Sequence, residues 1–523
     1  MNWKELRSFC LINILQIVII FDDMFRIGSL FDDVIFIRSQ KYDDEWLISN
    51  EWFQIIVDVV GIPIITSIIS LFVAAASDTW PSKHGRRVSI MKWALIPYII
   101  GCIIYLITGI YPVIFISNNT YFNESTNTIL FYVSLSFYFI GYFCSFIGRN
   151  IISIMFKSYI LDTFSTEQQD KVNLVKSFMT GVAYVLWNGF FLLTFSLGTY
   201  NWNSSKETSE SNEIIEKGMS LLLLIGSAIS DILLVAGVFF FEKIVNEDQF
   251  DPSFYENIPQ TKTECIKQSL KNVLEGIKTI DFGVFSVFII LFFGWVDWYS
   301  FTKPIMYMER TYLYPGPKYM DERMLVYSTN YTIVGILVMI ESFVLYVTKW
   351  RLDKFTVLSY LLCSISSLLF IGLDPQKNDA DSFSWKNYFL SSIPFFFSSM
   401  ILTALKSFPY SLMRDFVPEN KHGVTMGFMH IFINLGQLIS YLFIFMTKNI
   451  SKTNQITIIE DSNDQYYDFP NQYSFVFLLC IISLIVSFNF YYLRKSLHKQ
   501  SQNGEYYNKE KQKLLEMDQS KWK

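Results

Sequence analysis

Residues 77–87 read SDTWPSKHGRR and join two long apolar runs, residues 55–76 and residues 88–116. Each run is long enough for a membrane-spanning helix, which needs about 20 apolar residues. Positive charge next to such segments marks the cytoplasmic side of the membrane, and the short stretch contains Arg86 and Arg87. The stretch therefore predicts a cytoplasmic loop between two membrane-spanning helices.

The charges of this loop are placed so that they can pair. Asp78 lies at the end of the first run, and Arg86 and Arg87 lie at the start of the second. Gly85 precedes the arginines and permits a tight backbone turn. We expect a half-exposed ion pair across the loop, worth about 1 kcal/mol.

The composition is that of a membrane protein without catalytic motifs. The chain has 523 residues, of which 51% are hydrophobic and 18% aromatic, whereas soluble domains average about 45–50% apolar residues. A net charge of −5 argues against a nucleic-acid partner. The cysteines and histidines show neither a disulfide framework nor a metal-ligand spacing, and no phosphate-binding loop or Gly-x-Ser-x-Gly motif is present. The sequence therefore predicts no enzyme, no cofactor and no metal site.

Twelve apolar segments predict twelve transmembrane helices and an all-α membrane protein. They cover residues 6–37, 52–76, 89–116, 128–155, 174–197, 218–241, 282–308, 327–348, 355–373, 387–411, 424–446 and 473–493. The polar stretch between the sixth and seventh segments separates two groups of six. The expected domains are an N-terminal half, a cytoplasmic linker, a C-terminal half and a cytoplasmic tail, at residues 1–241, 242–280, 281–494 and 495–523.

The linker contains apolar residues at helical spacing with lysines between them. These residues are Ile266, Leu270, Val273, Leu274 and Ile277. The pattern predicts an amphipathic helix on the membrane face, with a partner-binding helix as the alternative.

Five N-glycosylation sequons give an independent expectation for topology. They begin at Asn118, Asn123, Asn203, Asn330 and Asn449, each after an odd-numbered segment. Because the loop at residues 77–87 follows the second segment and is expected inside, all five are expected outside. The parity predicts a glycoprotein with both termini in the cytoplasm.

Three short motifs resemble the sucrose-transporter-like branch, the glycoside–cation symporters, of the major facilitator superfamily. An Asp, six residues and Gly-Arg-Arg is the form that the loop at residues 77–87 takes in that branch. Residues 295–299 (WVDWY) are similar to its Trp-x-x-Trp-Phe segment, and Lys157 with Asp162 is similar to its Arg-x-x-x-x-Asp. The chain departs from the branch in the fourth segment, where Arg149 stands in place of an acidic residue.

The resemblance implies a major facilitator fold and secondary active transport of a sugar or glycoside by proton symport, through alternating access. We expect a monomer in the lipid bilayer, in the plasma membrane rather than an internal one. The expected gating residues are Asp78, Gly85, Arg86, Arg87, Asp162 and Asp415. The alternatives are a carrier of an organic anion or amino acid and a non-transporting membrane receptor or scaffold.

Charged residues inside spans are costly, at about 2.5–3.5 kcal/mol each on insertion scales, so they usually face a partner or an aqueous path. The expected substrate and proton site consists of Asp22, Arg26, Lys157, Trp295, Asp297 and Trp298. Further charged candidates are Asp23, Asp58, Arg149, Asp231, Lys303, Glu341 and Lys406. Two simpler readings remain open: Asp22 and Arg26 neutralise each other on one helix face, and Asp297 hydrogen-bonds a neighbouring helix.

Overall fold

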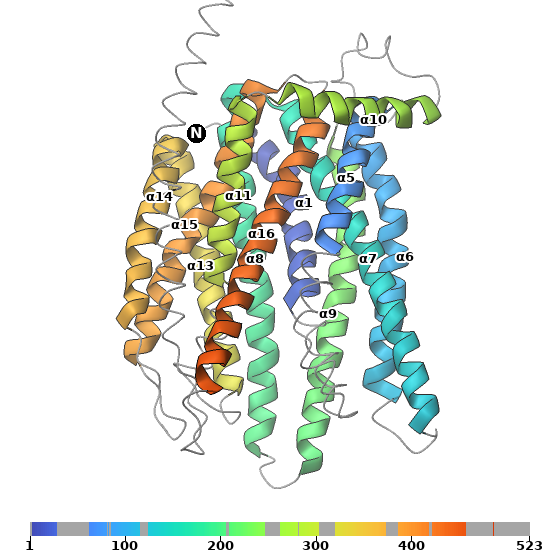
Figure 1. The fold of residues 1–523 in the computed structure, drawn as a ribbon, viewed down its shortest axis with the longest axis vertical. Helices are drawn as coiled ribbons and strands as arrows, with labels where there is room; N and C mark the ends of the chain where they lie inside the picture. The colour runs from blue at the N-terminus through green and yellow to red at the C-terminus, as the bar shows by residue number, and fades with distance from the viewer. Residues whose placement is uncertain are drawn as a thin grey trace, which may run out of the picture.

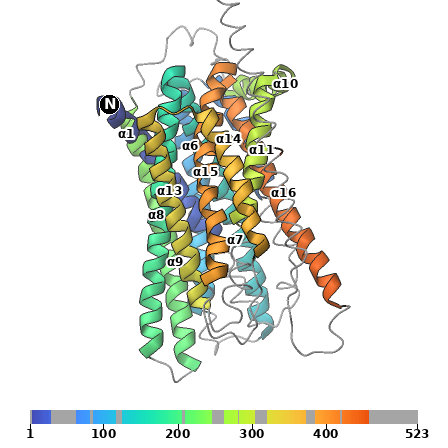
Figure 2. The same cartoon turned by 90° about the vertical axis from the view of Figure 1, so that its left-hand side faces the viewer.

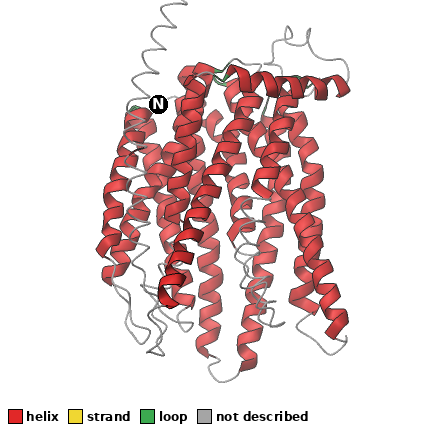
Figure 3. Ribbon diagram, viewed as in Figure 1, coloured by secondary structure: helices red, strands yellow, loops and turns green. Residues whose placement is uncertain are grey.

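In the computed structural model of the chain, the described residues form helices joined by short loops and turns (Figures 1 and 3). The described residues are 3–28, 62–80, 82, 85–115, 124–204, 209–245, 262–280, 282–302, 320–372, 385–417, 421–456 and 485. No strand occurs within these ranges. The predicted all-α class is confirmed.

The helices follow the predicted order. The first half contains α1 (Trp3–Gly28), α5 (Ile62–Asp78), α6 (Arg86–Phe115), α7 (Glu124–Thr163), α8 (Thr166–Ser204) and α9 (Ser209–Ile244). The linker contains α10 (Lys262–Thr279). The second half contains α11 (Phe282–Thr302), α13 (Met320–Thr348), α14 (Leu352–Ser367) with the 3₁₀ helix η6 (Leu368–Gly372), α15 (Trp385–Phe416) and α16 (His422–Ile456). The first eleven predicted spans each overlap a helix, and the twelfth lies almost wholly outside the described residues.

Seven of the described helices are long and apolar enough to cross a membrane: α6, α7, α9, α11, α13, α15 and α16. The outer face of α6 carries exposed apolar side chains, which are unfavourable in water. Ile96, Ile99, Ile100, Ile103 and Ile107 recur every one to four positions and are 39–63% exposed. An exposed apolar stripe of this kind matches contact with lipid.

Several helix pairs connect the two halves, including α8 with α15 and α7 with α16, and two pairs make the most extensive contacts. α8 packs on α13, and α5 packs on α16. The first pair approaches closely because each helix carries a glycine at the crossing: a Cβ on Gly181 would lie 2.6 Å from the carbonyl oxygen of Gly335. Small residues at such crossings let the two backbones come together.

α10 lies across one end of the bundle, roughly at right angles to the other helices (Figures 1 and 2). Its Val273 is buried against Leu71 and Val424, whereas Leu274 and Ile277 are more than half exposed. The helix occupies the stretch for which the sequence predicts an amphipathic helix. Its exposed apolar residues suit the boundary between lipid and water.

Candidate functional site

The ion pair expected across the loop at residues 77–87 is present, but it is buried. Arg87 Nη2 lies 2.6 Å from Asp78 Oδ1, and the two side chains are 1% and 0% exposed. Gly85 has φ 79°, a conformation that residues with a side chain rarely adopt, so it makes the turn that the sequence predicts. The expectation of a half-exposed pair is wrong because helices of both halves cover it.

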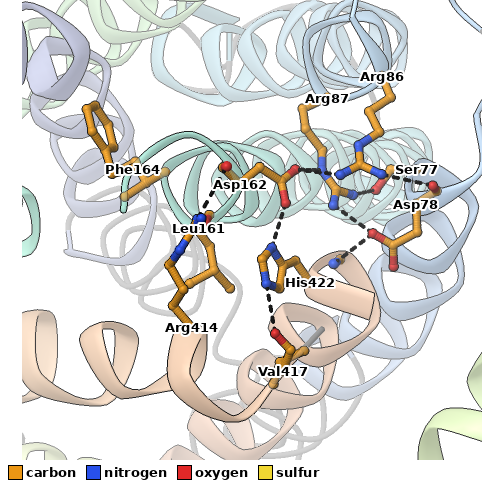
Figure 4. A network of polar contacts seen from close by, with 12 residues as sticks. Ser77, Asp78, Arg86, Arg87, Leu161, Asp162, Phe164, Arg414, Val417 and His422 are labelled. Atoms are coloured by element: carbon orange, nitrogen blue, oxygen red, sulfur yellow. Dashed lines mark hydrogen bonds and ion pairs between the residues drawn. The ribbon is translucent and has the colours of Figure 1, made fainter. Parts of the chain in front are cut away.

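Asp162, at the end of α7, connects the loop to the rest of the bundle (Figure 4). Its Oδ2 accepts hydrogen bonds from Arg87 Nε at 2.8 Å and from Arg86 Nη2 at 3.2 Å. Its Oδ1 lies 2.7 Å from Nδ1 of His422, the first residue of α16. We call Asp78, Arg86, Arg87, Asp162 and His422 the charge network.

The charge network and the neighbouring Arg414 connect the two halves in three places. Asp78 Oδ1 and Oδ2 accept the backbone N–H groups of Gly423 at 2.9 Å and Val424 at 3.0 Å, so a carboxylate of α5 caps the first turn of α16. Negative charge at a helix N-terminus is favourable. His422 contacts Asp162, and Arg414 of α15 donates to the backbone carbonyls of Leu161 and Asp162. These contacts hold the halves together at the end that carries α10 (Figure 1).

His422 belongs to none of the sequence motifs and falls between the tenth and eleventh predicted spans. The structure buries its side chain completely and places both ring nitrogens against oxygen atoms. Nδ1 faces Asp162 Oδ1, and Nε2 lies 3.1 Å from the carbonyl oxygen of Val417. The ring therefore links Asp162 of the first half to the end of α15.

Four cations gather between the halves, deeper in the bundle. Arg149 and Lys157 come from α7, Lys176 from α8 and Lys406 from α15. Lys157 and Lys406 lie near enough to act electrostatically on Lys176, whose side chain is almost wholly buried. We call Arg149, Lys157, Lys176 and Lys406 the cationic cluster.

Aromatic rings accompany the cationic cluster. Lys176 Nζ lies 3.7 Å from the ring centre of Tyr410, and Lys157 Nζ lies 5.7 Å from the same ring. Lys406 Nζ lies 4.8 Å from the ring centre of Trp295, one of the predicted site residues. Rings attract ammonium groups through their negative faces, so these contacts position the lysines.

The WVDWY motif of α11 divides between two faces of the helix. Trp295 faces Lys406, and Trp298 lies edge-on to Tyr184 of α8 at 6.4 Å between ring centres. Asp297 is fully buried and interacts electrostatically with Tyr360 of α14, inside the second half. Residues three apart share a helix face, whereas the residue between them points elsewhere. The described contacts therefore place Trp298 against the first half and Trp295 beside Lys406, whereas the described interaction of Asp297 lies within the second half.

Asp22 is buried in α1 and belongs to a second polar group, within the first half. Tyr98 Oη of α6 lies 2.8 Å from Asp22 Oδ1 and 2.9 Å from Asp231 Oδ1 of α9. Ser230 Oγ also donates to Asp22, at 3.3 Å. The side chain of Arg26 lies outside the described residues, as does that of Asp415.

No protein-family model matches the sequence, and a search of curated proteins finds no match. Solved structures do match. A bacterial homologue of the iron transporter ferroportin aligns over 93% of this chain and 99% of its own, with a TM-score of 0.59 at 10% identity. The human organic anion transporter MFSD10 also aligns over 93% of this chain and 99% of its own, with a TM-score of 0.57 at 8% identity. The major facilitator proton:xylose symporter XylE aligns over 93% and 95%, with a TM-score of 0.53 at 13% identity.

The chain has the major facilitator fold. At these identities the likeness concerns the fold and not the solute. This is the fold of secondary transporters rather than of enzymes, and it agrees with the two six-helix halves predicted from the sequence. The described residues contain no group of three or more His, Cys, Asp or Glu side chains that could hold a metal ion.

Other charged candidates occupy other parts of the major facilitator fold. Glu341 of α13 accepts hydrogen bonds from Ser399 Oγ at 2.6 Å and Thr403 Oγ1 at 2.7 Å, both in α15. It therefore joins two helices of the second half. Asp23, Asp58 and Lys303 fall outside the residues whose side chains are described.

One of the five predicted glycosylation sites is wrong on structural grounds. Asn330 lies inside α13, is 1% exposed, and accepts hydrogen bonds from Tyr388 at 3.2 Å and Ser392 at 3.4 Å. A buried amide within a membrane-length helix cannot carry a glycan. Asn118 and Asn123 lie outside the described residues, and so do the side chains of Asn203 and Asn449.

Sequence reasoning missed Lys176, Tyr98 and His422. Each stands alone among apolar or loop residues, and its partners come from distant segments. One signal was available for Lys176: it lies within a predicted span, where a cation is costly. No comparable signal exists for Tyr98, because tyrosine is frequent in membrane helices.

Proposed function

We propose that this protein is a secondary active transporter that moves a small polar solute across a membrane by alternating access. The charge network carries this proposal, because it joins the two halves at one end of the bundle. Its cross-contacts, such as Asp78 to Gly423 and Asp162 to His422, can break without breaking either half. Rocking of one half against the other would open this end and close the opposite one.

We further propose that a proton is the coupling ion and that Asp22, Tyr98 and Asp231 hold it. The Tyr98 hydroxyl has a single hydrogen, yet it lies within hydrogen-bond distance of a carboxylate oxygen on each side. It can donate to only one of them, so the second contact is a hydrogen bond only when the other carboxyl is protonated. A proton shared by two buried acids is the state from which uptake and release can follow.

Two sets of observations bear on the identity of the solute, and they favour different solute classes. The loop and span-seven motifs resemble sugar–proton symporters, and the structurally similar XylE is a proton:xylose symporter. The structurally similar MFSD10 is an organic anion transporter, and the cationic cluster favours that class. We propose a monomer in the plasma membrane.

Uptake of radiolabelled solutes into proteoliposomes with an imposed pH gradient tests transport. The panel contains sucrose, xylose, succinate, citrate and glutamate. At least one solute should accumulate above its external concentration, and a protonophore should abolish the accumulation. Binding of a solute without uptake under any gradient would contradict transport and favour a receptor or scaffold.

A further inference from the structure

We infer that the transported solute is a small organic anion and that the cationic cluster binds it through its carboxylate or phosphate groups. This inference rests on the proposed transport function and narrows its substrate class. It differs from the expectation of a neutral sugar that the sequence motifs raise. The argument uses the position, burial and surroundings of the cluster.

The cluster lies where an alternating-access carrier needs its binding site. Arg149 and Lys157 come from the first half and Lys406 from the second, and Tyr410 of the second half contacts Lys176 of the first. A ligand bound there touches both halves and is sensitive to their relative movement. A charge cluster confined to one half would not have this property.

The charges described around Lys176 and His430 are positive. The charges that act on Lys176 are those of Lys157 and Lys406, and those that act on His430 are Lys157, Arg149 and Lys406. Burying the charge of Lys176 is costly unless an opposite charge compensates it. A bound anion would supply that compensation and would gain two or more charge-assisted hydrogen bonds.

His430 of α16 gives a second, independent observation at the same place. Both of its ring nitrogens are buried, and neither has a hydrogen-bond partner among the described residues. Native proteins rarely leave buried polar atoms without a hydrogen-bond partner, so such an atom indicates a position for a ligand or a water molecule. An anion or its hydroxyl group within the cluster would satisfy one nitrogen.

The length of the cluster indicates an organic anion rather than a single inorganic ion. Arg149 and Lys157 are eight residues apart on α7, which is about 12 Å along a helix. A sulfate or phosphate ion spans less than half of that distance. A solute with an anionic group at each end, or with one anionic group and a polar body, can contact both residues.

Lys176 has a structural alternative that makes a different prediction. Its Nζ donates to Asn173 Oδ1 at 2.6 Å, one turn earlier in α8, and the whole side chain is 1% exposed. If Lys176 serves stability, its replacement by methionine should lower the melting temperature. If it serves anion binding, that replacement relieves repulsion and should raise the melting temperature while it weakens binding, as is common at functional sites.

The test measures the melting temperature of the purified full-length protein with succinate, citrate, glutamate or inorganic phosphate at matched ionic strength. Sucrose and xylose serve as neutral probes. At least one organic anion should stabilise the protein, and Lys176→Met and Lys406→Met should each weaken its apparent affinity by about tenfold to a hundredfold. Lys271→Met is the matched control, because Lys271 lies on α10 with its side chain 66% exposed.

Uptake of the stabilising anion into proteoliposomes then separates the possible outcomes. Accumulation that is lost in Lys176→Met but kept in Lys271→Met supports the inference. Accumulation of a sugar but of no anion overturns the inference and leaves transport intact, whereas uptake of no solute overturns transport itself. Stabilisation by phosphatidylglycerol alone, by inorganic phosphate alone, or by an anion that is never transported also overturns it, since the cluster would then serve a lipid or an adventitious ion.

Discussion

The Asp78 carboxylate of α5 lies 2.9 Å from the backbone nitrogen of Gly423 in α16, so a side chain of the first half caps a helix of the second. The same carboxylate forms the buried ion pair with Arg87 at 2.6 Å. Removing its charge weakens both interactions. Only the cap contacts to α16 cross between the halves, and losing an N-cap costs about 1–2 kcal/mol, so Asp78→Asn should shift the two-state equilibrium toward opening of this end by roughly fivefold to thirtyfold.

Thiol labelling measures that opening. Met413 is fully buried in α15 at the end that carries the charge network, so a Met413→Cys reporter, with the native cysteines replaced by alanine, should react slowly with a permeant maleimide. Asp78→Asn should speed the reaction. Glu242→Gln is the control, because Glu242 of α9 pairs with Lys92 of α6, in its own half, at 2.7 Å. Equal labelling rates in all three proteins would exclude a gating role for Asp78.

The crossing of α8 and α13 leaves no room for a methyl group. A Cβ on Gly181 would lie 2.6 Å from Gly335 O and 3.0 Å from Met339 N, both backbone atoms that cannot rotate away. Gly181→Ala should therefore push the helices apart and lower the unfolding free energy by about 1–3 kcal/mol. Thermal melting of the purified protein measures the loss.

Gly189, in the same helix, provides the control for Gly181. A Cβ there would meet no described atom within 4 Å. Because alanine favours a helix over glycine by about 1 kcal/mol, Gly189→Ala should be neutral or stabilising. If both variants melt alike, the close approach of the halves at this crossing does not limit stability.

Some features were predictable because they depend on local sequence. Apolar runs of membrane length locate the spans, and Gly85 with its positive φ makes the turn between Asp78 and Arg87. The opposite placement of Trp295 and Asp297 also follows from helical spacing alone, since residues two positions apart are rotated by about 200°. The expectation of one site containing Trp295, Asp297 and Trp298 did not take this rotation into account.

Other features depend on segments that meet only in the folded chain. The burial of the Asp78–Arg87 pair comes from Asp162 and His422, which lie about 80 and 340 residues further along the chain. The cationic cluster draws on three helices of both halves, and no spacing in the sequence relates Lys176 to Lys406. Short motifs can identify single residues of such a site but not the distant residues that contact them in the folded chain.

Burial of Asn330 predicts that its sequon stays unmodified. Thr332→Ala removes the sequon while it leaves the buried amide of Asn330 and its hydrogen bonds in place. In a glycosylating host, glycosidase digestion should give the same mass shift for this variant as for the original chain. Ser205→Ala, which removes the sequon at Asn203, is the comparison and should lose one glycan. A smaller mass shift in Thr332→Ala would show that α13 is modified before it folds.

The last prediction concerns the proton and compares Asp22 with Asp297. Asp22 shares the Tyr98 hydroxyl with Asp231, at 2.8 Å and 2.9 Å, whereas Asp297 interacts with Tyr360 inside the second half. Asp22→Asn removes a carboxyl that can take up the shared proton, so it should abolish accumulation driven by a pH gradient.

Exchange of solute at equal concentrations on the two sides of the membrane distinguishes a loss of proton coupling from a loss of folded protein in the same variants. Asp22→Asn should retain exchange, because exchange needs alternating access but no net proton movement. Asp297→Asn should lower accumulation and exchange together, in proportion to the loss of folded protein. Both activities are measured on one purified preparation of each variant, with the amount of folded protein determined by size-exclusion chromatography. If Asp22→Asn still accumulates solute along the pH gradient while Asp297→Asn does not, the proton site lies in α11 and not between α1, α6 and α9.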